Sequence, residues 1–291
     1  MKLKNLLSLA MASALTLSLA ACSSAPAESA APAESAPAQS AAPAESDVSD
    51  SDLAYVQQNG TLKIGYTLYE PMNYLDENGK LTGFETDFAT AVCKQLDLEP
   101  EFVEINWDAK TMELDSKRID CIWNGMTITP DLEEALSIGD PYVKNYQVVV
   151  IRAADADKFK TTADLASGSV EAESGSAGEG AVQADENLSQ AAYTSVVKQT
   201  DALLEVKTGK ADACVLDFVL ANAMVGQGDY SDLTVIPDLQ LSVEEYGVGF
   251  RKGSDITSAF NDALKALTED GTMAKLADQY GLTDQLLSNQ K

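Results

Sequence analysis

The 291-residue sequence contains no histidine, the side chain that titrates near neutral pH and most often binds metals. This absence excludes histidine-based triads and histidine metal sites, and it lowers the expectation of catalysis. Basic residues are scarce, with 20 Lys and Arg against 46 Asp and Glu and a formal net charge of −26. A chain this acidic is a poor partner for nucleic acid, whose phosphates require cationic side chains. We therefore expect no enzyme, no metal and no cofactor.

Cysteine is also rare, with four positions in the chain. Cys22 lies in an N-terminal segment described below, which leaves Cys93, Cys121 and Cys214, an odd number that guarantees at least one free thiol. Apolar residues flank each of the three, and this context favours small buried side chains over a bridge. A disulfide between Cys93 and Cys121 stays open as the alternative.

The N-terminal segment has the pattern of a bacterial export signal. Lys2 and Lys4 precede a short apolar run at residues 6–21, and small residues lead directly to Cys22. The segment resembles a lipoprotein signal peptide at 1–21, with a lipid on Cys22 that would anchor the chain outside the cell membrane. A transmembrane anchor fits less well because the run is short and rich in Ala and Ser. Without Lys2 and Lys4, the chain would carry 18 basic and 46 acidic residues, a charge of −28.

Residues 22–52 begin with the lipidated cysteine and continue as an Ala/Pro/Ser/Glu repeat in which APAES occurs three times. The repeat has no aromatic residue and almost no β-branched residue, so it cannot build a core. We predict a disordered spacer between the membrane anchor and a folded part.

Strands and helices alternate in two series along the rest of the chain. The first series has βαβαβ order, which favours a parallel sheet. A second series starts near residue 146 and the chain returns near residue 246, which predicts two α/β lobes joined by two crossovers. We predict lobe 1 at residues 53–145 plus 244–291 and lobe 2 at residues 146–243. The expected strands are 61–66, 101–105, 119–123, 147–151, 169–172, 213–216, 233–236 and 246–250, and the main helices are 84–96, 109–114, 201–208, 218–225, 255–267 and 272–280.

The predicted helix at 84–96 is amphipathic. Phe84, Phe88 and Val92 fall at helical spacing, a pattern typical of a face packed on a core. Glu85 lies off this face, and we expect it to point to solvent.

The stretch at residues 119–142 carries the polar groups that best fit a ligand site. Its apolar strand ends in a turn where Gly125 allows close approach of a ligand to the backbone and Thr127 supplies a hydroxyl. Thr129 and Pro130 are then the N-cap and first residue of a helix. A strand that ends in an open turn at a helix N-terminus is where α/β proteins bind small ligands.

Several motifs in order point to one family: TLKIGY, IDCIWNGMTITP, GDPY, SGSAG, KADACVLD, EYGVGF and EDGTMAKLADQYG. Together they resemble the bacterial extracellular solute-binding proteins of family 3 over nearly all of residues 60–287. The resemblance implies the type II periplasmic-binding-protein fold, in which two α/β lobes close over a small ligand. It also implies a monomer outside the cell membrane that delivers a polar amino acid to an ABC permease.

The family's ligand site can be placed on this sequence. The resemblance implies an aromatic platform, contacts to a ligand amino group, and a carboxylate-binding turn in lobe 2. These roles fall on Trp107, on Gly125, Thr127 and Asp217, and on Ser176 and Ala177. From the residues alone, Trp107 and Trp123 are more often core side chains and Asp217 can equally be a helix N-cap. The full predicted ligand-binding set is Tyr66, Tyr69, Glu70, Trp107, Asn124, Gly125, Met126, Thr127, Leu132, Ser176, Ala177 and Asp217.

One position departs from the family pattern and bears on the charge of the ligand. Where the resemblance expects an arginine for a ligand α-carboxylate, this chain has Leu132. No other arginine is expected nearby, although Lys144 could reach inward, and a lysine does not reproduce the planar fork of a guanidinium. The inferred pocket instead holds Asp217, Glu70 and Glu173.

These acids lie beside predicted aromatic residues, a combination that suits an organic cation through ion pairing and cation–π contact. The sequence therefore favours a positively charged solute over a neutral or acidic amino acid. An amino acid remains the alternative if Ser176, its turn and Lys144 together hold the carboxylate.

Two other functions stay open. A dehydratase or lyase on the same fold could use Asp217 or Glu70 as acid and base, but the lack of histidine and of a close carboxylate pair counts against it. A ligand-sensing surface lipoprotein is the third possibility.

Overall fold

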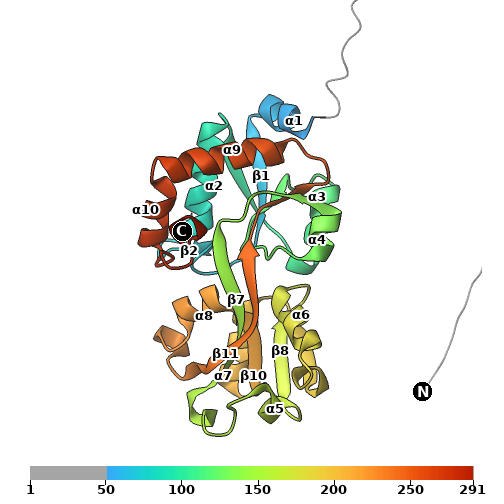
Figure 1. Cartoon of the computed structure of the whole chain (residues 1–291), viewed down its shortest axis with the longest axis vertical. Coiled ribbons are helices and arrows are strands. Elements are labelled where there is room, and N and C mark those ends of the chain that lie inside the picture. Colours follow the sequence, from blue (N-terminus) through green and yellow to red (C-terminus); the bar gives the residue numbers. More distant parts are fainter. Residues whose placement is uncertain (1–50, 291) are drawn as a thin grey trace, which may run out of the picture. The chain divides into compact units, whose positions relative to one another are not determined.

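The computed structural model describes residues 51–290, so the predicted signal peptide and nearly all of the spacer lie outside the described residues. Within this range the strands form two five-stranded sheets and one two-stranded hairpin. We call the parts built on the two large sheets lobe 1 and lobe 2 (Figure 1). No helix within residues 51–290 is long and apolar enough to cross a membrane.

Lobe 1 contains the first βαβαβ series and the C-terminal helices. Its strands are β1 (Thr61–Tyr66), β4 (Glu99–Glu104), β5 (Cys121–Ile122), β6 (Leu136–Ile138) and β12 (Gly249–Arg251). They lie in the order β4-β1-β5-β12-β6, with β1 parallel to both β4 and β5, which confirms the expected parallel arrangement. The helices are α1 (Asp52–Asn59), α2 (Phe84–Gln95), α3 (Lys110–Asp115), α4 (Pro130–Ala135), α9 (Ile256–Glu269) and α10 (Thr272–Gln279), and the hairpin is β2 (Tyr74–Leu75) with β3 (Leu81–Thr82).

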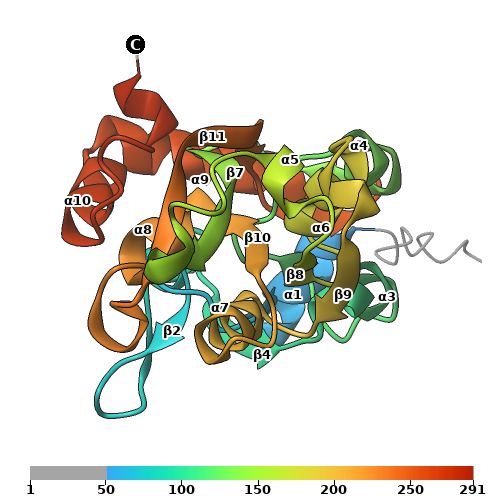
Figure 2. The ribbon, with the colours of Figure 1, turned by 90° about the horizontal axis from the view of Figure 1, so that it is seen from below.

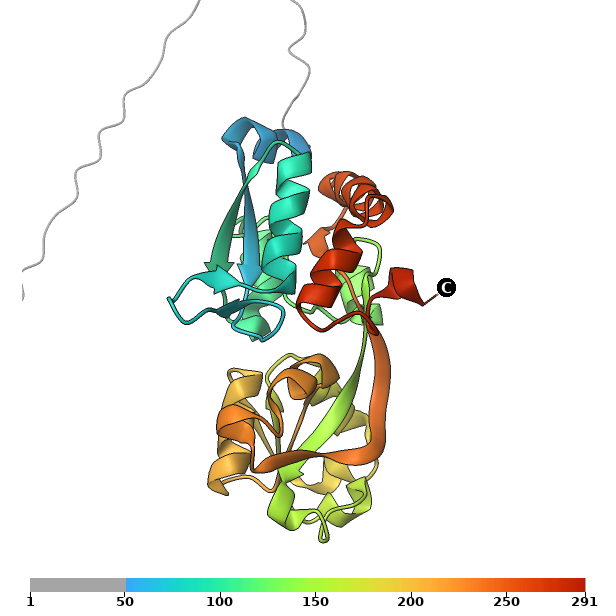
Figure 3. The same cartoon turned by 90° about the vertical axis from the view of Figure 1, so that its left-hand side faces the viewer.

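In lobe 1, an aromatic cluster joins helix α2, from the N-terminal half of the chain, to helix α9, from the C-terminal half. Phe88 of α2, Trp123 and Phe260 of α9 meet with ring-centroid distances of 4.9 Å for Phe88–Trp123 and 5.2 Å for Trp123–Phe260. Trp123 is fully buried and therefore belongs to the core, as its residue type and pattern favoured. Helices α2, α9 and α10 lie together on one side of this lobe (Figure 3).

Lobe 2 contains the second series. Its strands are β7 (Val143–Arg152), β8 (Ser169–Glu173), β9 (Ala192–Val196), β10 (Ala213–Asp217) and β11 (Leu233–Tyr246), in the order β11-β7-β10-β8-β9. Val148 and Val150 of β7 pack with residues of α7 and α8, whereas Val149 and Ile151 pack with α5 and α6. Helices lie on both sides of this sheet (Figure 2), and the burial of Val148, Val149, Val150 and Ile151 explains the continuous apolar run of β7. The helices are α5 (Thr162–Leu165), α6 (Ala177–Ala184), α7 (Gln199–Thr208) and α8 (Phe218–Met224).

Strands β7 and β11 are much longer than expected and run side by side between the lobes (Figure 3). The sequence predicted separate strands at 233–236 and 246–250. The first is the start of β11, one strand of 14 residues that extends to Tyr246, and the second overlaps the separate strand β12 at residues 249–250. Register shifts after Val235 and Gln240 let the ladder continue past Pro237, where a regular strand would lose a hydrogen bond. The stretch between the two predicted strands therefore belongs to β11, and its residues Gln240 and 243–245 pair with β7.

Two further expectations concern single side chains. Glu85 does not point to solvent; it is 1% exposed and lies beneath the Gly125 turn, so that expectation was wrong. Cys93, Cys121 and Cys214 are all buried and free, in agreement with the favoured prediction of small buried side chains.

Candidate functional site

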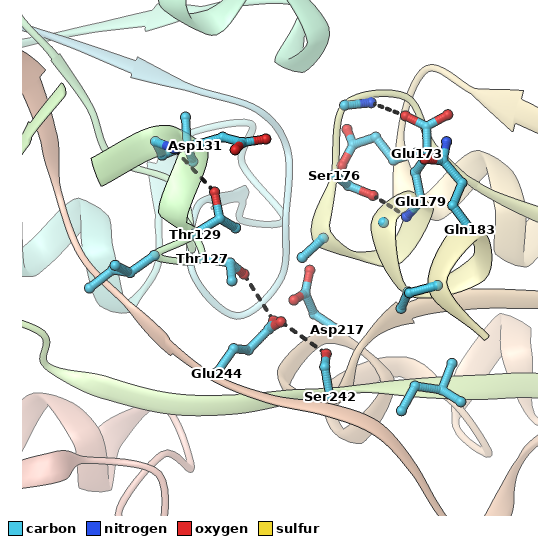
Figure 4. Close-up of a pocket in the computed structure, with 18 of the residues that line it drawn as sticks. Thr127, Thr129, Asp131, Glu173, Ser176, Glu179, Gln183, Asp217, Ser242 and Glu244 are labelled. Carbon is cyan, nitrogen blue, oxygen red and sulfur yellow. Dashed lines mark hydrogen bonds between the residues drawn. The ribbon is translucent and has the colours of Figure 1, made fainter. Parts of the chain in front are cut away.

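A cleft of about 950 Å³ lies between the lobes and is bordered by β11 of the two connecting strands (Figure 4). Lobe 1 contributes the segment after β4 and the turn after β5, lobe 2 contributes α6 and the ends of β8 and β10, and β11 contributes residues 241–244. The acidic side chains that line it are Asp131, Glu173, Glu179, Asp185, Glu186, Asp217 and Glu244. Among residues 51–290, Lys110 is the only Lys or Arg in the lining.

The lobe 1 wall depends on the Gly125 turn. Gly125 has a φ of +56°, and a Cβ there would lie 2.5 Å from a ring carbon of Tyr69, so both the conformation and the space require glycine. The backbone N–H of Gly125 donates to both carboxylate oxygens of Glu85 at 2.9 Å. Glu85 also accepts from the Tyr142 hydroxyl and, at 3.1 Å, from Asn73 Nδ2. Burial raises the pKa of Glu85 to about 7 despite these donors.

Trp107 and Lys110 form the next part of the lobe 1 wall. Both are buried, and Lys110 Nζ lies 4.7 Å from the centre of the Trp107 ring. Lys110 Nζ also donates to the Gly175 carbonyl of lobe 2 at 2.9 Å. Burial lowers the pKa of Lys110, and the nearby charge of Glu173 opposes that shift. Sequence reasoning missed Lys110, although a residue three positions after Trp107 shares its helical face.

Asp217 and Glu244 form a carboxylate pair at the base of the cleft. The amide nitrogen of Asn145 donates to Asp217 Oδ1 and to Glu244 Oε1, each at 2.6 Å. Gln147 Nε2 donates to the same two oxygens, each at 2.8 Å. Burial, followed by the charge of Glu244, raises the pKa of Asp217 to about 7.

Strand pairing explains why these acids meet. In the antiparallel ladders of β7, Gln147 lies opposite Asp217 and Asn145 lies opposite Glu244. Since residues two apart on a strand share a face, both amides reach both carboxylates. The sequence-based argument that no close carboxylate pair exists was therefore wrong, because the segment that contains Glu244 had not been recognised as a strand.

A third buried acid, Glu173, ends β8 beside this pair. Its pKa is raised to about 8, mainly by burial and then by the charge of Asp217, while Lys110 opposes the shift. The neighbouring turn at 174–178 was predicted to bind a carboxylate. Here the Gly175 N–H donates to Glu179 at 2.7 Å, and Ser176 Oγ accepts from the Glu179 N–H at 3.1 Å as a helix N-cap.

The structure brings most of the predicted ligand residues together but leaves some away from the cleft. Tyr69 is buried behind the Gly125 turn, where its hydroxyl lies 2.6 Å from the Tyr246 hydroxyl. Met126 is fully buried in the lobe 1 core, and Tyr66 packs edge-on against Phe102. The predicted residues that line the cleft are Trp107, Asn124, Gly125, Thr127, Leu132, Ser176, Ala177 and Asp217, and those that do not are Tyr66, Tyr69, Glu70 and Met126.

The lining residues differ in what their polar atoms already do. Thr127 donates its hydroxyl to Glu244 at 2.9 Å, as Figure 4 shows. Asp217 occupies the N-cap position of α8, yet its side chain makes no capping bond. Leu132 is half-buried and packs against the hydrophobic cluster that contains Trp107, so the position of the missing arginine is an apolar part of the cleft wall. Lys144 is exposed and absent from the lining, which contradicts the idea that it reaches inward.

The two α/β lobes, the paired connecting strands and the cleft between them define a type II periplasmic-binding-protein fold. The chain matches the bacterial extracellular solute-binding proteins, family 3, over residues 62–283, and it belongs to that family. The family's relatives include amino-acid-binding proteins of ABC transporters.

Individual comparisons place the chain at moderate distance from characterised proteins. It is 28% identical over 227 residues to the L-cystine-binding protein TcyJ of Escherichia coli K12, covering 77% of this chain and 84% of the relative. The P235GK mutant of ArgBP from T. maritima is 32% identical with a TM-score of 0.73, covering 79% of this chain and 98% of that one. AncCDT-1, described as an ancestral amino acid-binding protein and precursor of cyclohexadienyl dehydratase, is 32% identical with a TM-score of 0.73, covering 79% and 99%.

Proposed function

We propose that this protein is the extracytoplasmic binding component of an ABC importer, and that it captures a positively charged small solute in the cleft for delivery to a membrane permease. Family membership supports the transport role, and relatives named as arginine-binding proteins are compatible with a cationic ligand. A lipid on Cys22 would hold the protein at the membrane. If so, Cys22→Ser releases the protein from membranes and leaves ligand binding unchanged.

The observation that carries the charge assignment is the imbalance of the cleft lining. Seven acidic side chains line it, Asp131, Glu173, Glu179, Asp185, Glu186, Asp217 and Glu244, against Lys110 alone in residues 51–290. Lys110 is already bonded to the Gly175 carbonyl. A cation in a narrow, partly desolvated cleft gains more from such charges than it would in water. The Trp107 ring, which lines the same cleft, offers an additional cation–π surface.

The same geometry argues against a firmly held ligand α-carboxylate. Leu132 supplies no charge, and of the predicted carboxylate turn the Gly175 N–H already donates to Glu179, while the Ser176 hydroxyl accepts from the Glu179 N–H and keeps only its own O–H for a ligand. Lys110 is the remaining group of suitable charge, and it would have to leave a carbonyl partner. We therefore propose an organic cation, with a cationic amino acid as the nearest alternative.

Calorimetric titration with matched pairs tests this proposal. Each cationic amino acid is compared with its decarboxylated amine: arginine with agmatine, lysine with cadaverine and ornithine with putrescine. The proposal predicts that at least one amine binds as tightly as its amino acid or more tightly. Micromolar binding of the amino acids with no binding of the amines would refute the inference from Leu132.

We further propose that residues 53–145 with 244–291, and residues 146–243, move as the two bodies that close on the ligand. The pairing of β7 with β11 at Asn145 and Glu244 supports a hinge at this level. Small-angle scattering with and without ligand tests the motion, since closure reduces the radius of gyration.

A dehydratase or lyase activity is the second candidate, and two observations favour it. Asp217 and Glu244 form a close carboxylate pair, and Glu173 beside them holds its proton near neutral pH. The resemblance to AncCDT-1 points the same way. Incubation with prephenate distinguishes the two functions. We expect no turnover. If prephenate is turned over and the activity disappears in Asp217→Asn, the protein is an enzyme and the transport proposal is wrong.

A further inference from the structure

The base of the cleft has more hydrogen-bond acceptors than donors. Asp217 and Glu244 share the amide groups of Asn145 and Gln147, and Glu244 also accepts from Thr127. The second carboxylate oxygen of Asp217, Oδ2, accepts from Gln199 Nε2 of α7. Gln147 Oε1 is buried without a hydrogen-bond partner among residues 51–290. The protein donors of the cluster thus do not satisfy all of its acceptors.

No protein cation neutralises the two carboxylates. Within residues 51–290, none of the ion pairs involves Asp217 or Glu244. The titratable groups that act on the pair from the surrounding elements are acids or phenols: Glu173 of β8, Tyr69 of the loop after β1, and Tyr246 of β11. Lys110, the cation of the lining, bonds to carbonyl oxygens instead. Either a proton or a ligand cation must therefore balance this site.

We propose that Asp217 and Glu244 form one composite site that binds a cationic nitrogen of the ligand in exchange for a proton held on Asp217, so that Glu244 on β11 helps to determine cation specificity. This inference rests on the function proposed above. In the exchange, the carboxyl O–H bond breaks, the proton passes to buffer, and the ligand N–H groups donate to both carboxylates. No bond of the ligand itself is broken, and charge is conserved.

The location of Glu244 gives the exchange a structural consequence. Glu244 lies on one of the two strands that connect the lobes, opposite Asn145 of the other. Asp217 lies at the end of β10 in lobe 2, and Thr127, which donates to Glu244, belongs to lobe 1. A cation bound by both acids would therefore contact the connecting strands and lobe 2 together. Cation binding is therefore coupled to the arrangement of β7 and β11 through the Glu244 side chain.

The pH dependence follows from the same balance. The pKa of Asp217 is raised to about 7, so Asp217 holds a proton below that pH and releases it above. Agmatine stays cationic throughout this range. As the pH increases towards 7, the affinity of the protein for agmatine should increase by up to about tenfold per pH unit. Above pH 7 the affinity should level off. Proton release on binding should be close to one at pH 6.0 and close to zero at pH 8.5.

The experiment is titration calorimetry of the full mature protein with agmatine and with L-arginine, in three buffers of different ionisation enthalpy at each pH. Glu244→Gln is compared with Glu245→Gln, its exposed neighbour on the opposite face of β11. We expect Glu244→Gln to lose at least about tenfold in affinity at pH 8.5 and to abolish the dependence of proton release on pH. Glu245→Gln should stay within about twofold of wild type.

The outcomes separate this inference from the function on which it rests. If agmatine or arginine binds but wild type releases no proton at pH 6.0, or Glu244→Gln behaves like Glu245→Gln, the exchange is wrong while cation capture stands. If neither probe binds even at pH 8.5, the proposed cationic ligand fails. Should Glu244→Gln not fold, the wild-type proton count still decides.

Discussion

Glu85 in lobe 1 and Asp217 in lobe 2 are both buried carboxyl groups near the cleft, and the pKa of each is raised to about 7, yet their surroundings differ. Glu85 behind the lobe 1 wall is bonded to the Gly125 N–H, the Tyr142 hydroxyl and Asn73, and it does not line the cleft. Asp217 lines the cleft and shares its donors with a second acid, Glu244. Burial and a raised pKa therefore do not identify a ligand site by themselves; access to the cleft and a shortage of donors distinguish Asp217.

The largest expected effect comes from removing the charge of Asp217. Asp217→Asn should lower affinity for a cationic ligand by about 3–5 kcal/mol, or two to four decades, because it removes a buried partner of the ligand charge. Titration calorimetry with agmatine at pH 8.5 measures the loss. Asp131→Asn, an exposed acid in the same lining, serves as the control and should change affinity less than about threefold. Equal losses in both variants would mean that the cleft acts only through its overall charge.

The next effect concerns stability and tests the structural role assigned to Glu85. Its folded-state pKa of about 7 lies above the ordinary 4.5, so the folded state binds the proton more tightly and Glu85 favours folding below pH 4.5. That contribution, about 3 kcal/mol, is lost as the pH rises through 7. Between pH 5 and pH 8, the free energy of urea unfolding should therefore fall less in Glu85→Gln than in the wild type.

Glu77→Gln, at an exposed position in the β2–β3 turn, is the control for this measurement and should retain the wild-type fall. Cation affinity at pH 8.5 should stay within about threefold of wild type in Glu85→Gln, because Glu85 does not line the cleft. A Glu85 variant that loses binding as severely as Asp217→Asn would remove the distinction between the two walls.

A smaller effect is expected at Lys110, the cation of the lobe 1 wall. Lys110→Met removes the one basic side chain of the described lining, so a cation without a carboxylate should bind no more weakly. In the same variant, the α-carboxylate of an amino acid ligand loses the nearest positive charge of the cleft. We expect the ratio of arginine to agmatine affinity to fall by about fivefold, near 1 kcal/mol. Lys144→Met, at an exposed position outside the lining, should leave that ratio unchanged.

Local patterns predicted the parts of the site that lie at the ends of regular elements. Asp217 follows an apolar strand, and Thr129 with Pro130 caps α4 as expected, with Thr129 Oγ1 accepting from the Leu132 N–H at 3.3 Å. These features depend on residues close in sequence, so spacing and capping chemistry suffice to find them.

The residues that sequence reasoning missed depend on contacts between distant segments. Glu85 has the position of a solvent-facing helix residue, and only the packing of the Gly125 turn against α2 buries it. Glu244 ends the stretch 239–244, in which apolar and polar residues alternate as in a strand, but Pro237 and Asp238 before it were taken as the end of the preceding strand. Its partner Asn145 comes from the other connecting strand, a pairing that register alone determines.

The most direct test of cation capture is a mass-spectrometric inventory of the small molecules released when the protein, purified from its native host, is denatured. The acidic lining with Asp217 and Glu244 at its base predicts a solute with net positive charge in near-stoichiometric amount. A neutral or acidic amino acid released at that level would contradict the account.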